Sequence, residues 1–172
     1  MLKIAVIGPE STGKSTLAEA ISKHFNVNYV AEFAREYLHN YGPHYCLNDI
    51  INIAIGQKEL IEKEASKKQE ILIADTELIV CKVWAEYVFG EIPDVITQNI
   101  RKQDFDLYLL CDIDIPWTYD PLRENPSLEE RKDIFNLYIN TLEDNNLNYS
   151  IIRGCHDQRV LSALQAIEKL RQ

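Results

Sequence analysis

The segment that most constrains the fold is GPESTGKS at residues 8–15, which matches the pattern G-x-x-x-x-G-K-[ST]. It follows a short apolar run at residues 3–7 and precedes residues 17–25, whose apolar positions have helical spacing. A strand, a glycine-containing turn and a helix in this order form a loop whose backbone N–H groups bind phosphate. We therefore expect residues 8–16 to bind the phosphates of ATP together with Mg²⁺.

The residue types of this loop fit that chemistry. Gly8 allows a sharp turn out of the strand, and Gly13 lets the backbone approach the phosphates closely. Lys14 is expected to reach the β- and γ-phosphates, and the Ser15 hydroxyl to bind Mg²⁺. The other residues assigned to the ATP site are Glu10, Ser11, Thr12 and Thr16.

The rest of the chain alternates strand and helix patterns. Further apolar runs rich in β-branched residues lie at 27–31, 71–74, 107–111 and 149–152. Strands that alternate with helices predict an α/β fold with a parallel sheet and right-handed crossovers, built as a single domain over residues 1–172.

One segment breaks the alternation. Residues 112–126 contain three prolines and have no periodicity, and Ser127 with Glu130 forms a capping-box pattern at the start of a helix. Because long irregular loops in compact domains are usually functional, we expect a lid at about residues 113–130.

Composition excludes several classes of function. The net charge of −9 disfavours a nucleic-acid-binding surface. There is no apolar run of about 18 residues and no signal-peptide pattern, so we expect no membrane partner and a cytoplasmic location. The spacing of the four cysteines matches no metal or redox motif, which indicates free thiols; Cys81 and Cys111 lie in apolar stretches.

Two acidic residues end apolar runs and are candidates for the Mg²⁺-side acid. Asp75 is the first choice, although it could instead cap the helix that follows. Asp112, which opens the irregular segment, is the second choice.

The acceptor side is predicted from the second strand. Glu32 follows it and could accept a proton from an attacking hydroxyl, while Arg35 could orient the acceptor. The alternative is a solvated ion pair between the two.

Aromatic and basic residues of the irregular segment are further candidates. Trp117 is either a local packing residue or a stacking surface for a planar ring. Arg123 and Arg131 are either lid residues that bind the transferring phosphate or surface charges. Trp84 lies among valines and is expected in the core.

Taken together, these segments resemble the ribosylnicotinamide kinase domain of bacterial NAD-biosynthesis regulators and related standalone P-loop proteins. The segments that carry the resemblance are GPESTGKST, AEFAREYL, IADTE with Trp84 behind it, DLYLLCDIDIPWTYDPLR and GCHDQR. The lid differs from the family's usual pattern at Tyr119 and Pro121.

The resemblance implies a nucleoside- and nucleotide-kinase fold with strand order 2-3-1-4-5. It implies transfer of phosphate from MgATP to the 5′-hydroxyl of nicotinamide riboside. Substrate would lie near Glu32, Arg35, Asp75, Trp117 and Asp120, with Arg123 acting from the lid. The region from Gly154 to Arg159 would lie beside the adenine. The alternatives are a kinase of another nucleoside or nucleotide, and a regulatory P-loop ATPase; the oligomeric state stays open.

Overall fold

The computed structural model describes residues 1–42, 44–100, 102 and 104–171. Five parallel strands form one sheet in the order β2-β3-β1-β4-β5, as the resemblance implies. The strands are β1 (Leu2–Ile7), β2 (Tyr29–Val30), β3 (Ile71–Asp75), β4 (Leu107–Cys111) and β5 (Tyr149–Ile152).

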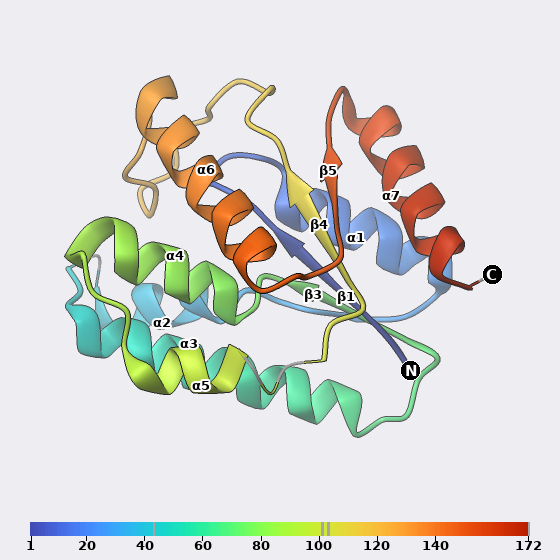
Figure 1. Cartoon of the computed structure of the whole chain (residues 1–172), viewed down its shortest axis with the longest axis horizontal. Coiled ribbons are helices and arrows are strands. Elements are labelled where there is room, and N and C mark those ends of the chain that lie inside the picture. The colour runs from blue at the N-terminus through green and yellow to red at the C-terminus, as the bar shows by residue number, and fades with distance from the viewer. Residues whose placement is uncertain (43, 101, 103, 172) are drawn as a thin grey trace.

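Helices cover both faces of the sheet (Figure 1). The seven described helices are α1 (Lys14–Phe25), α2 (Phe33–Tyr41), α3 (Leu47–Ala65), α4 (Leu78–Phe89), α5 (Asp94–Ile100), α6 (Leu128–Asp144) and α7 (His156–Arg171). Side chains of β1 alternate between two apolar clusters, because successive residues of a strand point to opposite faces. Ile4 and Val6 pack with α1 and α7, whereas Ala5 and Ile7 pack with α3, α4 and α6.

The carboxyl ends of the central strands define where a site can form. Val6 of β1 is in register with Asp75 of β3, and Ile7 with Leu110 of β4. The residues that follow these strands therefore meet at one edge of the sheet, where ligands bind in open α/β folds.

The structure departs from the sequence predictions at three places. β2 is shorter than residues 27–31, because the N–H of Val27 instead bonds the carbonyl of Ser22 at the end of α1. Neither α2 nor α5 has a counterpart among the predicted helices. Ser127 caps α6 as predicted, with its hydroxyl accepting from the N–H of Glu130, but no return bond from the Glu130 side chain is found among the described residues.

The irregular segment between β4 and α6 covers residues 112–127, because α6 begins at Leu128. We refer to residues 112–127 as the lid segment. Figure 1 shows it as the long loop that leads from β4 into α6.

Candidate active site

The glycine-containing loop joins β1 to α1 in a conformation that needs its two glycines. Gly8 has a φ of 140°, and a Cβ atom there would lie 2.7 Å from the carbonyl oxygen of Cys111 in β4. Gly13 has a φ of 76° and precedes α1. Both conformations disfavour residues with side chains. The loop thus starts α1 with Lys14 and Ser15, at the positive end of the helix dipole.

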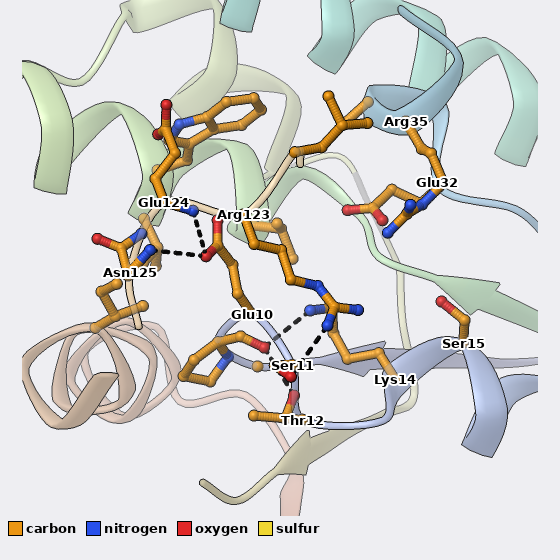
Figure 2. Close-up of a pocket in the computed structure, with 18 of the residues that line it drawn as sticks. Glu10, Ser11, Thr12, Lys14, Ser15, Glu32, Arg35, Arg123, Glu124 and Asn125 are labelled. Carbon is orange, nitrogen blue, oxygen red and sulfur yellow. Dashed lines mark hydrogen bonds between the residues drawn. The ribbon is translucent and has the colours of Figure 1, made fainter. Parts of the chain in front are cut away.

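Two side chains of the loop donate hydrogen bonds to the same backbone carbonyl and stabilise the loop conformation. The Thr12 hydroxyl, which is fully buried, donates to the carbonyl oxygen of Pro9 at 2.7 Å. The Lys14 Nζ atom donates to the same oxygen at 2.9 Å. The lysine therefore lies across the loop, as Figure 2 shows, and adds positive charge to the helix N-terminus. This arrangement suits an oligophosphate.

A cavity of about 210 Å³ lies between this loop, the lid segment and helices α2, α4 and α6. One end is polar and includes Lys14, Ser15, Glu32 and Arg35. The polar end also includes Gly8, Glu10, Ser11, Thr12, Gly13, Thr16 and Arg123. The apolar end is lined by Ala34, Leu38, Tyr45, Val80, Val83, Trp84, Tyr87, Val88, Pro121, Leu122, Ile134 and Tyr138.

The apolar end of the cavity carries aromatic rings that the sequence prediction did not place there. Trp84 is half-buried, and its ring centroid lies 4.8 Å from that of Tyr45 at an angle of 68°. The Trp84 Nε1–H donates to the Tyr45 hydroxyl at 2.9 Å, and Tyr45 in turn donates to the carboxylate of Glu124 in the lid segment. The prediction that Trp84 is a core residue is therefore wrong in part, because one side of the indole faces the cavity.

Asp75 ends β3 beneath the polar end of the cavity. It is 1% exposed, and within the described chain its Oδ1 atom has no hydrogen-bond partner. Burial raises the pKa of Asp75 to about 6; the charge of Glu32 adds to the increase, whereas a hydrogen bond with Ser15 and the charge of Lys14 oppose it. Asp75 does not cap α4, because Glu77 does so through its Oε1 atom and the N–H of Ile79.

These contacts fit a Mg²⁺ site made by Asp75 and Ser15. Carboxylate and hydroxyl oxygens are hard ligands, and protein Mg²⁺ sites beside phosphates use one or two carboxylates with the phosphates and water. A buried carboxylate oxygen without a partner is the kind of atom that a cation satisfies. No cluster of three or more His, Cys, Asp or Glu ligands occurs among the described residues, and such a site does not need one.

Asp112 has other partners. Its Oδ1 atom accepts from the N–H of Ile113 at 2.6 Å, and its Oδ2 atom forms an ion pair with Arg153. Its carboxylate is thus engaged at the start of the lid segment, and we retain Asp75 as the first choice for the Mg²⁺-side acid.

Glu32 and Arg35 both line the cavity but do not pair with each other. Arg35 instead bonds the carboxylate of Asp120 in the lid segment at 3.0 Å. Across the part of the chain that the structure describes, the Glu32 carboxylate has no ion pair or hydrogen bond. It is therefore available to a ligand hydroxyl, while Arg35 and Asp120 join α2 to the lid segment.

The lid segment binds the phosphate loop through side chains of Glu10 and Ser11. The Ser11 Oγ atom accepts from the N–H of Thr118 at 2.7 Å and from the Arg123 guanidinium at 3.0 Å. Glu10 accepts from the N–H groups of Glu124 and Asn125, as Figure 2 shows. Both loop residues were predicted to bind ATP; in the structure their side chains hold the lid segment.

Arg159 supports the loop from behind. It is 5% exposed, does not line the cavity and donates to the carbonyl of Thr12 at 2.9 Å and to that of Asp112 at 3.0 Å. It also bonds the carbonyl of Gly154 and the carboxylate of Asp114. With these four acceptors in place, Arg159 positions the loop; direct contact with the adenine stays a prediction.

Two further predicted residues lie outside the cavity lining. Trp117 packs near Tyr119, with ring centroids 6.2 Å apart, and its Nε1 atom is buried without a partner in the described chain. The structure does not place this indole where the stacking hypothesis needs it. Arg131 is not a surface charge: it is 3% exposed and donates to the carbonyl of Ile115.

Sequence reasoning missed Tyr45, Tyr87 and Glu124 as cavity residues. Tyr45 lies just before α3 in a segment without a motif, and Glu124 follows the predicted lid arginine by one position. Only Tyr87 could have been inferred from the sequence, because it follows Trp84 at helical spacing and so shares a helix face with it.

No helix in the described ranges is long and apolar enough to span a membrane.

A protein-family model described as an AAA domain (AAA_28) matches residues 3–159. The chain is 27% identical, over 97% of its length, to the trifunctional NAD biosynthesis/regulator protein NadR of Escherichia coli (strain K12). It spans 42% of the length of that relative.

Solved structures show the same fold. A crystal structure of NadR in complex with NR superposes with a TM-score of 0.80 at 23% identity, covering 98% of this chain and 51% of the other. A NadR structure with NAD and AMP-PNP gives the same score and identity, covering 98% and 49%. Thymidylate kinase from Ehrlichia chaffeensis matches with a TM-score of 0.68 at 18% identity over 98% of both chains. The predicted P-loop kinase fold and family resemblance are thereby confirmed.

Proposed function

This chain belongs to the AAA domain family, and we propose that it is an ATP-dependent kinase that phosphorylates the 5′-hydroxyl of nicotinamide riboside to nicotinamide mononucleotide. The observation that carries the proposal is the continuous cavity that runs from Lys14 and Ser15, past Glu32, to the rings of Tyr45 and Trp84. A phosphate-binding loop, a free carboxylate and an aromatic pocket in one cavity are the parts that a nucleoside kinase needs.

The phosphoryl donor would bind at the loop. Lys14 and the first turn of α1 would bind the β- and γ-phosphates of ATP, and Arg123 reaches the loop from the lid segment. Because the phosphoryl group carries its charge on its equatorial oxygens in the transition state, these cations would stabilise it. Ser15 and Asp75 would hold Mg²⁺, which neutralises charge on the phosphates when it is bound.

The acceptor would bind between the loop and the aromatic rings. Glu32 would accept the proton of the attacking hydroxyl or hold that hydroxyl in line with the γ-phosphate. Arg35, fixed by Asp120, would orient the ribose. The hydroxyl, the carboxylate and the phosphate would then meet at the polar end of the cavity, where water is largely displaced.

The choice of nicotinamide riboside rests on the charge and shape of the apolar end. The nicotinamide ring is planar and cationic, and an indole face attracts a cation by about 0.5–2 kcal/mol, depending on desolvation. Trp84 and Tyr87 offer rings, and Glu124 brings a carboxylate near them through Tyr45. The Escherichia coli relative carries NAD biosynthesis in its name, and one of the similar NadR structures was solved with NR; both support the same choice.

The second candidate is a kinase of another nucleoside or nucleotide. The observation that favours it is the match to thymidylate kinase over nearly the whole of both chains. Another nucleoside would use the same loop and the same Glu32 and would differ in the ring that contacts Trp84, whereas a nucleotide acceptor would attack through a phosphate oxygen and would not need Glu32 to accept a proton. In either case the reaction is proposed for the cytoplasm, with a small-molecule partner.

A nucleoside panel tests the proposal. ADP release is measured with nicotinamide riboside, adenosine, cytidine, uridine, thymidine and deoxythymidine monophosphate, and each product is identified by mass. We expect kcat/KM for nicotinamide riboside to exceed that of every other member of the panel by about two- to thirtyfold, the factors that about 0.5–2 kcal/mol of cation binding gives. A higher kcat/KM for any other member of the panel would overturn the acceptor assignment and leave the kinase assignment intact.

A further inference from the structure

Gln57 of α3 links two turns at the carboxyl edge of the sheet. Its side chain is 1% exposed and makes three hydrogen bonds to the backbone. The Oε1 atom accepts from the N–H of Phe33 at 2.7 Å. The Nε2 atom donates to the carbonyls of Ala31 and Thr76, each at 3.3 Å.

Two of these partners flank Glu32 in the sequence. The carbonyl of Ala31 belongs to the peptide unit before Glu32, and the N–H of Phe33 belongs to the unit after it. Because a residue has only two soft backbone dihedral angles, fixing both adjacent peptide units fixes the direction of its Cα–Cβ bond. Gln57 therefore sets where the Glu32 side chain leaves the backbone.

The third partner supplies a rigid anchor. Thr76 follows β3 directly, and its N–H donates to the carbonyl of Val6 in β1 at 3.0 Å. The neighbouring residue of α3 strengthens the link, since a Cβ atom on Gly56 would lie 2.2 Å from the ring of Phe33. The ring of Phe33 thus packs against the α3 backbone while its amide bonds Gln57, and the whole turn is held against the sheet.

We propose that Gln57 is a positioning residue for Glu32, holding its carboxylate at the distance from the phosphate loop that proton acceptance requires. The inference rests on the proposed function, because it takes Glu32 as the group that receives or aligns the acceptor hydroxyl. Rates of this kind are sensitive to placement: an error of about 1 Å can cost about a hundredfold. A buried amide that bonds the backbone on both sides of Glu32 suits this role.

A double-mutant cycle separates positioning from general support of the fold. Gln57→Met keeps the length of the side chain and removes all three hydrogen bonds. We expect kcat to fall by about ten- to a hundredfold while KM for ATP stays within about twofold. In the Glu32→Gln background, Gln57→Met should lower kcat by less than about twofold, because residues that act as a unit are not additive. An equal loss in both backgrounds would overturn the proposal.

Folding controls accompany the cycle. Ser22→Ala removes another buried side-chain hydrogen bond, from Ser22 to the carbonyl of Glu19 in α1, away from the turn that carries Glu32. It should lower thermal stability without changing kcat. Hydrogen exchange should show that the Phe33 amide loses protection in Gln57→Met. If Gln57→Met does not fold, Gln57→Glu, which keeps the length and the acceptor for Phe33, enters the same cycle with the same criterion.

The acceptor assignment and the role of Gln57 can be tested separately, because the cycle does not depend on which nucleoside is the acceptor. The cycle is measured with whichever nucleoside gives wild-type turnover. A higher kcat/KM with an acceptor other than nicotinamide riboside overturns the acceptor assignment and leaves the cycle valid. If no member of the panel is phosphorylated, there is no reaction rate to compare, and both the proposed kinase function and the positioning role of Gln57 are overturned.

Discussion

Replacing Arg159 by lysine is expected to loosen the phosphate-binding loop, because a lysine cannot reach all the groups that this arginine binds. The guanidinium donates to the carbonyls of Gly154, Thr12 and Asp112, at 2.8, 2.9 and 3.0 Å, and pairs with the carboxylate of Asp114. An ammonium is a compact donor without the planar fork of arginine. It could keep the ion pair with Asp114 but not the two deep carbonyls, Thr12 and Asp112.

The size of the effect follows from those two carbonyls. A hydrogen bond to a charged donor contributes about 1.5–3 kcal/mol, and a buried acceptor left unpaired costs about 1–3 kcal/mol. Partial relaxation reduces the sum, so we expect Arg159→Lys to lower the free energy of unfolding by about 3 kcal/mol. Because Thr12 lies in the loop, ATP affinity should also fall; if the competent loop is populated one-tenth of the time, the apparent Kd rises about tenfold.

Urea unfolding followed by ATP titration of the folded variant measures both effects. Arg153→Lys is the matched control, since Arg153 also pairs with an aspartate, Asp112, but its side chain is 65% exposed. The control should change the free energy of unfolding by less than about 0.5 kcal/mol. Unchanged stability of Arg159→Lys together with weaker ATP binding would refute the reasoning and indicate direct contact with the nucleotide.

One further substitution and two matched pairs of substitutions test the remaining parts of the site. Lys14→Ala should lower kcat by two or more decades, about 2.7 kcal/mol or more, with an unchanged melting temperature; retention of a tenth of kcat would exclude the phosphate role. Asp75→Asn should weaken the Mg²⁺ dependence of turnover, whereas Asp112→Asn should not, and the reverse pattern would show that the wrong acid was chosen. Trp84→Leu should raise the acceptor's KM by about five- to thirtyfold, from about 1–2 kcal/mol of lost ring contact, whereas Trp117→Leu should mainly lower stability; a KM effect confined to Trp117→Leu would restore the stacking hypothesis.

The phosphate loop and the sheet were predictable because their signals are local. The loop has fixed residues at fixed spacing, and the apolar runs of β1, β3 and β4 read as strands covered on both faces. Asp75 could be placed for the same reason, since it ends one of those runs.

The rest of the site depends on contacts between distant segments. α4 is apolar on several sides because one side packs on the core and another lines the cavity, so hydropathy could not tell that Trp84 faces a ligand space. Arg35 pairs with Asp120, 85 positions away, in place of nearby Glu32. Gln57 and Arg159 bind mainly backbone groups, and a backbone carbonyl carries no sequence signal.

Phosphorus NMR of the complete reaction tests the central claim most directly, because it shows where the γ-phosphate goes. With MgATP and nicotinamide riboside, we expect a phosphomonoester signal to grow in a one-to-one ratio with ADP, and the mass of the product to match nicotinamide mononucleotide. Glu32→Gln should slow that signal by about two decades or more. Inorganic phosphate released at the same rate with or without any nucleoside would contradict the kinase assignment and support a regulatory ATPase instead.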